Sequence, residues 1–168
     1  MAGWNTSSTW MKIALICLCL GLLLFVIAFA TTGWMVYTAY RFDRSHGLWE
    51  FKECSSRGCI SGEVNPSSSR ADWYRATQAM ECFGLICIVI ATFLLLLYFF
   101  VASCKRRNAL VATIIFTFAA VGFIVIGIAI FASKFDNYGY EIGWSMGLAI
   151  AAAILAFVAG IMEVLEIK

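Results

Sequence analysis

The sequence predicts an all-α membrane protein with a small β element, in which four helices cross the bilayer. Two observations lead to this fold class. The 168 residues are 62% hydrophobic and 13% charged, whereas an ordinary soluble domain carries roughly 25% charged residues. The uncharged residues also gather in four long stretches, and a polar segment, residues 41–81, separates the first two. We therefore expect one compact domain over residues 1–168 that contacts membrane lipid along most of its length.

The absence of charge places the spans, because an ionised side chain at the bilayer centre costs at least ~2.5 kcal/mol. A helix needs about 20 apolar residues to cross the hydrocarbon core. Four stretches meet both conditions, and we expect spans at about residues 12–33, 80–103, 109–132 and 142–163. The uncharged stretches lack the ionisable groups that pumps and proton-coupled transporters use. Glu81 and Glu163 are interpreted as interfacial charges near helix ends.

A cleaved signal peptide is the alternative interpretation of the first span. Lys12 precedes an apolar run, Ile13–Ala30, which ends in small residues around Phe29. This run has 18 residues, however, and the apolar region of a signal peptide has about 7 to 15. Cleavage would also leave an odd number of spans, so we expect the first span to be retained.

The basic residues predict the orientation of the chain. Four spans place both termini on one side, together with the short connector 104–108, which contains the basic run Lys105–Arg107. Because such connectors stay in the cytosol, we expect cytosolic termini and two extracellular loops, residues 34–79 and 133–141. Cys104 lies beside the basic run at the membrane surface, where it is a candidate for reversible palmitoylation. An unmodified thiol is the alternative.

The first extracellular loop shows two strand-like runs, Met35–Phe42 and Leu48–Cys54, both rich in aromatic residues. Four turn-forming residues then separate Cys54 from Cys59, so the two cysteines should face each other across a hairpin. An oxidising compartment would join them in a disulfide. A zinc site is the alternative, but it needs more ligands than the lone His46 supplies.

The second and fourth spans show further helical patterns. Residues Ala71–Met80 are expected to form a helix that continues into the second span. The fourth span carries small residues at four-residue spacing, which let another helix approach closely. These are Gly143, Gly147, Ala152, Ala156 and Gly160. Packing within one bundle and association between molecules are both compatible with this pattern.

The composition also argues against several function classes. One histidine and the absence of a Gly-rich phosphate loop leave no acid–base pair or activated nucleophile. We therefore expect a protein that is not an enzyme, with no catalytic residue, cofactor or metal. The net charge is only +2, and no block of five or six like charges occurs, so nucleic acid is not an expected partner.

The first loop resembles the signature of the claudin superfamily. Trp34 is followed by the run Gly47, Leu48 and Trp49 and then by the two cysteines, between a first and a second span. The resemblance covers essentially the whole chain. It implies a left-handed four-helix bundle topped by a small extracellular antiparallel sheet from both outer loops, with tryptophans at the boundary between sheet and membrane.

The details are most similar to the branch that contains peripheral myelin protein, the epithelial membrane proteins and the lens fibre membrane intrinsic protein. The two cysteines lie close together, and Gln78 stands where claudins usually carry an arginine. The resemblance implies a plasma-membrane protein of cell–cell junctions that self-associates in adhesion or as a paracellular barrier. Other four-span family members are further possible partners. An auxiliary subunit of an ion channel or receptor, or a regulator of membrane organisation and trafficking, is the alternative.

Overall fold

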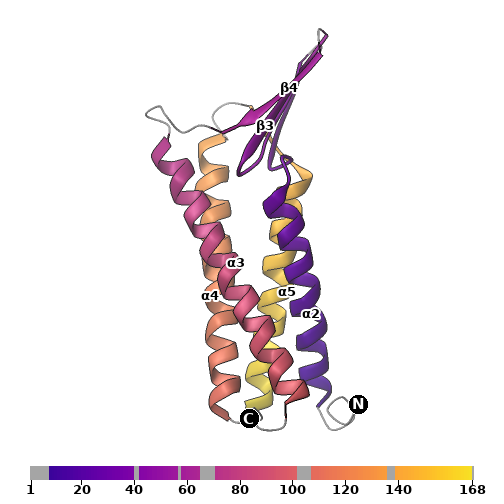
Figure 1. Ribbon diagram of the computed structural model, residues 1–168, viewed down its shortest axis with the longest axis vertical. Helices are drawn as coiled ribbons and strands as arrows, with labels where there is room; N and C mark the ends of the chain where they lie inside the picture. The colour runs from indigo at the N-terminus through magenta and orange to yellow at the C-terminus, as the bar shows by residue number, and fades with distance from the viewer. Residues whose placement is uncertain are drawn as a thin grey trace.

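The computed structural model describes residues 8–39, 42–56, 58–64, 71–101, 107–135 and 139–167. Four long helices lie side by side, and a small sheet stands at one end of them (Figure 1). The helices are α2 (Thr9–Ala30), α3 (Ala71–Phe100), α4 (Arg107–Phe135) and α5 (Trp144–Ile167). The predicted fold class, an all-α four-span protein with a small β element, is confirmed.

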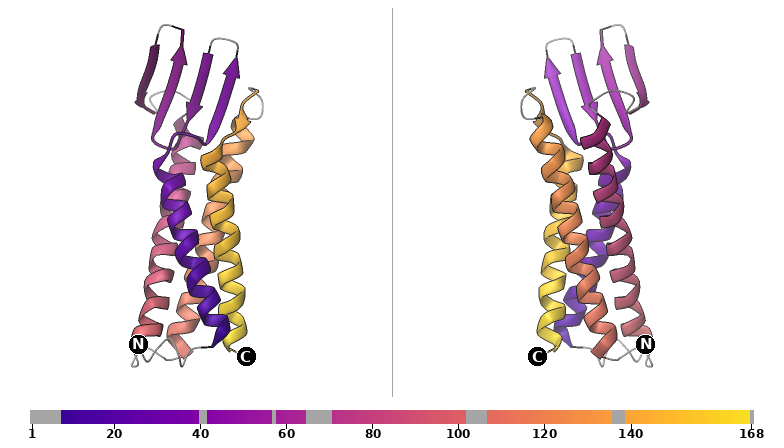
Figure 2. Two further views of the ribbon diagram at one scale, coloured as in Figure 1. Left: turned by 90° about the vertical axis from the view of Figure 1, so that its right-hand side faces the viewer. Right: turned by 90° about the vertical axis from the view of Figure 1, so that its left-hand side faces the viewer.

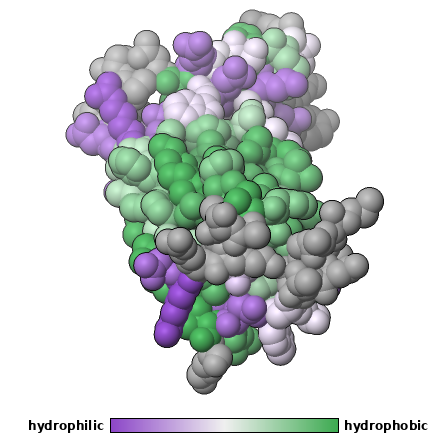
Figure 3. Space-filling model, turned by 60° about the horizontal axis from the view of Figure 1, so that its bottom comes forward, coloured by the Kyte–Doolittle hydropathy of each residue, from purple (hydrophilic) through white to green (hydrophobic). Residues whose placement is uncertain are grey.

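All four helices are long and apolar enough to cross a membrane. Figure 3 shows the corresponding surface, a hydrophobic band between two hydrophilic ends. α3 has 30 residues, which at 1.5 Å per residue is about 45 Å, against a hydrocarbon core of about 30 Å. Its first turns therefore project beyond the bilayer towards the sheet, and they include the segment expected to be helical ahead of the second span.

The bundle packs as two close helix pairs, α3 with α4 and α2 with α5, and α4 also contacts α5. Two small residues of α5 serve the contact with α2. Ala152 and Ala156 are fully buried, and a methyl group added to Gly21 of α2 would lie 3.3 Å from the carbonyl oxygen of Ala152. At this contact the small-residue pattern of the fourth span is therefore used within one molecule.

The sheet has five antiparallel strands in the order β4-β3-β2-β1-β5 (Figure 2). The strands are β1 (Met35–Ala39), β2 (Phe42–His46), β3 (Glu50–Ser55), β4 (Gly58–Glu63) and β5 (Glu141–Ile142). The sequence pattern indicated one strand over 35–42, whereas the chain uses this region for parts of two paired strands. The second loop adds β5, so both loops contribute to the sheet, as the resemblance implied.

Two glutamates that we interpreted as interfacial charges are in fact buried in the bundle. Glu81 in α3 and Glu163 in α5 are both 0% exposed. The interpretation was wrong about exposure, because it considered the position of each glutamate along its span and not the side of the helix that it occupies. The helices instead continue through both positions with the side chain on the buried side.

Candidate interaction surface on the sheet

The base of the sheet is anchored by a tryptophan that the sequence motif contains. Trp34 is fully buried, and its indole N–H donates to the carbonyl oxygen of Ala28, 2.7 Å away, at the end of α2. Its ring meets Phe131 of α4 edge-on with 5.4 Å between centroids. The tryptophan therefore joins the start of the first loop to two different helices.

The next motif residues form the connection between β2 and β3. A methyl group on Gly47 would lie 2.6 Å from both the carbonyl oxygen of Thr31 and the Cα of Thr32, so only glycine fits there without movement of the backbone. Leu48 is fully buried. Trp49 is 40% exposed and packs on Phe29 with 5.3 Å between ring centroids.

The first turns of α3 hold this connection from the other side. The Tyr74 hydroxyl donates to the carbonyl oxygen of Gly47, and the Gln78 amide donates to that of Leu48 at 2.7 Å. Gln78, which stands where claudins usually carry an arginine, is therefore a structural link between the second span and the sheet.

The second loop closes the base through backbone contacts. The Gly143 N–H donates to the carbonyl oxygen of Trp34, and the Ser145 N–H donates to that of Gly33, both at 2.9 Å. A methyl group on Gly143 would collide with Gly33. The glycine that the sequence suggested for helix packing thus brings the two loops together.

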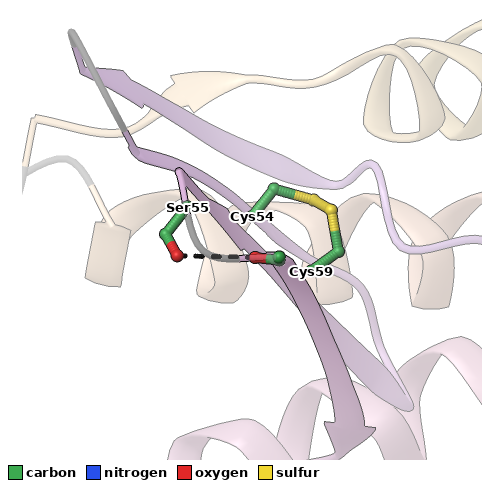
Figure 4. Close-up of a disulfide and its surroundings, with 4 residues drawn as sticks. Cys54, Ser55 and Cys59 are labelled. Carbon is green, nitrogen blue, oxygen red and sulfur yellow. Dashed lines mark hydrogen bonds between the residues drawn. A yellow bond between two sulfur atoms is a disulfide. The ribbon is translucent and has the colours of Figure 1, made fainter.

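The two loop cysteines form a disulfide at the far end of the β3–β4 hairpin (Figure 4). Cys54 and Cys59 are directly opposite in the strand register, with 4.0 Å between their Cα atoms. The Ser55 hydroxyl donates to the carbonyl oxygen of Gly58 at 3.4 Å. Gly58 has a φ of 135°, a value that favours glycine in the tight turn.

The strand register divides the sheet into two chemically different faces. Directly opposite residues share a face, and successive residues alternate. One face, here called the aromatic face, carries apolar side chains that are at least one-third exposed. They are Tyr37 at 37%, Phe42 at 39%, Ile60 at 70% and Ile142 at 63%. The opposite face carries the disulfide and charged residues, namely Asp43, Glu50, Lys52, Glu63 and Glu141.

The charges on the aromatic face are paired within the sheet. Arg44 Nε lies 3.0 Å from Glu53 Oε1, and the Arg44 guanidinium sits 5.0 Å from the Phe42 ring centroid. The pair is partly exposed, so it adds little stability. Its main consequence is that the acidic and basic groups of this face neutralise each other, while the apolar side chains stay exposed.

His46 lies on the aromatic face beside the second loop. Its ring centroid is 6.1 Å from that of Phe51 and 5.6 Å from that of Tyr140. Burial lowers the pKa of His46; nearby Glu53 raises it, and Arg44 lowers it further. The imidazole is therefore favoured in its neutral form at this position.

The aromatic face was missed by sequence analysis. Partial alternation was visible around Tyr37, but β4 contains two glycines and a serine among its six residues, so Ile60 gave no strand signal. Among the described residues, no group of three or more His, Cys, Asp or Glu side chains could hold a metal ion. Cys104, the candidate palmitoylation site, lies outside the described residues.

No curated protein sequence matches the chain significantly. The family model described as PMP-22/EMP/MP20/Claudin family matches residues 7–163, nearly the whole chain and both loops of the sheet. The match agrees with four membrane-spanning helices and with a sheet built from two loops. The chain is a claudin-like, multi-pass membrane protein and belongs to the PMP-22/EMP/MP20/Claudin family.

Proposed function

We propose that the protein is a structural component of cell–cell contacts at the plasma membrane, where copies self-associate through the aromatic face of the sheet. The observation that carries this proposal is the exposure of large apolar side chains on the part of the molecule that stands outside the hydrophobic band. Ile60 is 70% exposed and Ile142 is 63% exposed. Apolar patches that face water are characteristic of protein interaction sites.

A second copy of the chain is the partner that the chemistry favours. Because Arg44 and Glu53 neutralise each other on the aromatic face, two copies of this face can meet without repulsion between like charges. The rigid attachment of the sheet to α2, α3 and α5 supports the same proposal, since an immobile surface loses little entropy when it binds.

The proposal places the sheet outside the cell and both termini in the cytosol. The Cys54–Cys59 disulfide supports this orientation, because disulfides persist in oxidising compartments. The start of α2 and the end of α5 lie together at the end of the molecule opposite the sheet (Figure 2). This is the side that the basic residues assign to the cytosol.

The experiment uses two substitutions on one strand. Ile60 and Ser61 are adjacent, both exposed, and lie on opposite faces of β4. Tagged wild type, Ile60→Asp and Ser61→Asp are expressed in cells that lack junctions, and these cells are mixed with untransfected cells. The measured quantity is the ratio of tagged protein at each class of contact to that in free membrane.

We expect wild type and Ser61→Asp to concentrate only where both neighbours express the protein, and Ile60→Asp to stay at the level of free membrane. Equal enrichment of all three proteins would rule out the aromatic face. Uniform distribution of wild type would reject homophilic contact and favour a role in its own membrane, as an auxiliary subunit or a regulator of membrane organisation. Surface labelling of each variant controls for delivery to the membrane.

A further inference from the structure

Glu81 occupies a core position of the membrane bundle. The buried residues of α3 recur every three or four positions, and Tyr74, Thr77, Glu81 and Ile88 belong to this stripe. Glu81 is 0% exposed. Its carboxyl group lies against Gly127 of α4, where an added methyl group would collide with it. The absence of a side chain at Gly127 therefore leaves the space that the Glu81 carboxyl group occupies at the α3–α4 contact.

The carboxyl group of Glu81 lacks a hydrogen-bonding partner. Both of its oxygens are buried, and neither has one within the described part of the chain. The other buried glutamate differs, because the Thr117 hydroxyl donates to Glu163 Oε2 at 3.1 Å. Burying an unpaired charge is costly, and an ionisable side chain within a membrane-spanning helix is a candidate functional site.

Among the described residues, no basic side chain hydrogen-bonds to the carboxyl group of Glu81. On α3 the nearest titratable or charged residues are the adjacent Cys82, then Arg75 and Cys87, and then Tyr74. On α4, Lys134 is seven residues beyond Gly127 and exposed. The charged residues described on α2 and α5, at positions 12, 163 and 166, lie near the start of α2 and the end of α5. These two helix ends are at the end of the bundle away from the sheet (Figure 1). With no basic partner among the described residues, a proton is the group that neutralises this carboxylate.

We propose that Glu81 is a proton-binding site, and that the bound proton keeps α3 closely packed on α4. Binding forms an O–H bond on one carboxylate oxygen and converts the anion into a neutral carboxylic acid. Release returns the proton to water and leaves an anion at the α3–α4 contact. The ionised form then favours separation of the two helices, which lets water reach the carboxylate.

The sheet side of the membrane supplies the proton. The residues from Glu81 to Phe100, the end of α3, number 20, and a helix of this length spans about 30 Å, the thickness of the hydrocarbon core. Glu81 therefore lies near the boundary of the hydrocarbon core on the side of the sheet. Protons from the solution around the sheet have the shorter route to it.

The same helix transmits the change to the sheet. Gln78 and Tyr74 precede Glu81 by three and seven residues and lie on the same side of α3. They donate to the carbonyl oxygens of Leu48 and Gly47 at the sheet base. A movement of α3 away from α4 would therefore strain both hydrogen bonds and loosen the β2–β3 connection.

The test compares wild type with Glu81→Gln, which has nearly the same shape and cannot ionise, and with Glu81→Met as a second neutral variant. Glu163→Gln is the matched control, since it removes the other buried glutamate. Each full-length protein is placed in lipid nanodiscs, and the thermal unfolding midpoint is measured from mildly acidic to mildly alkaline pH. Hydrogen exchange across residues 42–55 is compared between wild type and Glu81→Gln at equal pH, which cancels the chemical exchange rate.

If the folded protein holds one proton more than the unfolded chain, the stability of wild type falls as pH rises. We expect this loss in wild type and Glu163→Gln, and a flatter profile in Glu81→Gln and Glu81→Met. At alkaline pH, exchange in residues 42–55 should be faster in wild type than in Glu81→Gln. Parallel pH profiles of wild type and both neutral variants, or a wild type without pH dependence, would overturn the proposal. If one of the two neutral variants does not fold in sufficient amount, a flat pH profile of the other is enough to support the proposal.

Discussion

The sheet and the helical bundle of this protein are stabilised in different ways, and the difference runs along the long axis of the molecule. The bundle has a core of its own, in which Ala152 and Gly21 bring two helices into close contact. The strands have few buried side chains of their own, and the fully buried residues beside them, Trp34 and Leu48, pack at the helix ends. The bundle therefore supplies the buried contacts that stabilise the sheet.

The stabilising contacts of the sheet are concentrated at its base, whereas its tip is mainly exposed. The base combines buried side chains with hydrogen bonds from α3, as in the Gln78–Leu48 contact. The tip consists of a disulfide-linked hairpin that carries the exposed Ile60. A substitution at the base should therefore affect the whole molecule, whereas one at the tip should have a local effect.

The largest effect is expected for Trp34→Ala at the base. The substitution removes a fully buried ring and its hydrogen bond to Ala28, so we expect a loss of about 3–5 kcal/mol in the free energy of unfolding. Trp49→Ala is the matched control, because Trp49 is 40% exposed and should lose clearly less. Unfolding of both variants in mixed micelles by denaturing detergent measures the difference. Equal losses would show that the base is not the anchor of the sheet.

A smaller and more local effect is expected when the disulfide at the tip is removed. The bridge closes a loop with a sequence separation of 5, and the chain-entropy relation gives about 2 kcal/mol for a loop this short. In Cys54→Ser with Cys59→Ser, hydrogen exchange should rise in β3 and β4 and stay unchanged in the four helices. Faster exchange in the helices would contradict the separation between tip and bundle.

The smallest effect is expected from His46, and its sign is opposite to that proposed for Glu81. Burial lowers the pKa of His46 from its ordinary value of 6.5, so the unfolded chain binds more protons than the folded one. The contribution of His46 to stability is therefore complete above pH 6.5 and is lost as the pH falls through the lowered pKa. Acidic pH should thus loosen the sheet, and alkaline pH the bundle.

This prediction is tested by measuring the hydrogen exchange rate of β2 in wild type and in His46→Gln at equal pH. Faster exchange in wild type at acidic pH, with no difference at neutral pH, is the expected result. An identical response of both proteins would mean that acid sensitivity of the sheet arises elsewhere.

The sequence by itself determined the number of helices and the class of the protein. Four uncharged apolar stretches predict four membrane spans because hydropathy is summed along the chain and needs no knowledge of packing. Local spacing likewise identified the Cys54–Cys59 hairpin, since both partners lie within one turn and its flanking strands. The motif of Trp34, Gly47 and Trp49 indicated the family to which the chain belongs.

Only the tertiary structure decided which side of each element is covered. The aromatic face depends on a register that pairs Tyr37, Arg44, Glu53 and Ile60 across four strands, and neither β2 nor β4 has a strong strand pattern of its own. The burial of Glu81 depends on Gly127, which is distant in sequence and becomes its neighbour only when α3 packs on α4. Hydropathy places a residue along the membrane normal, but contacts between distant residues decide whether its side chain meets lipid, water or another helix.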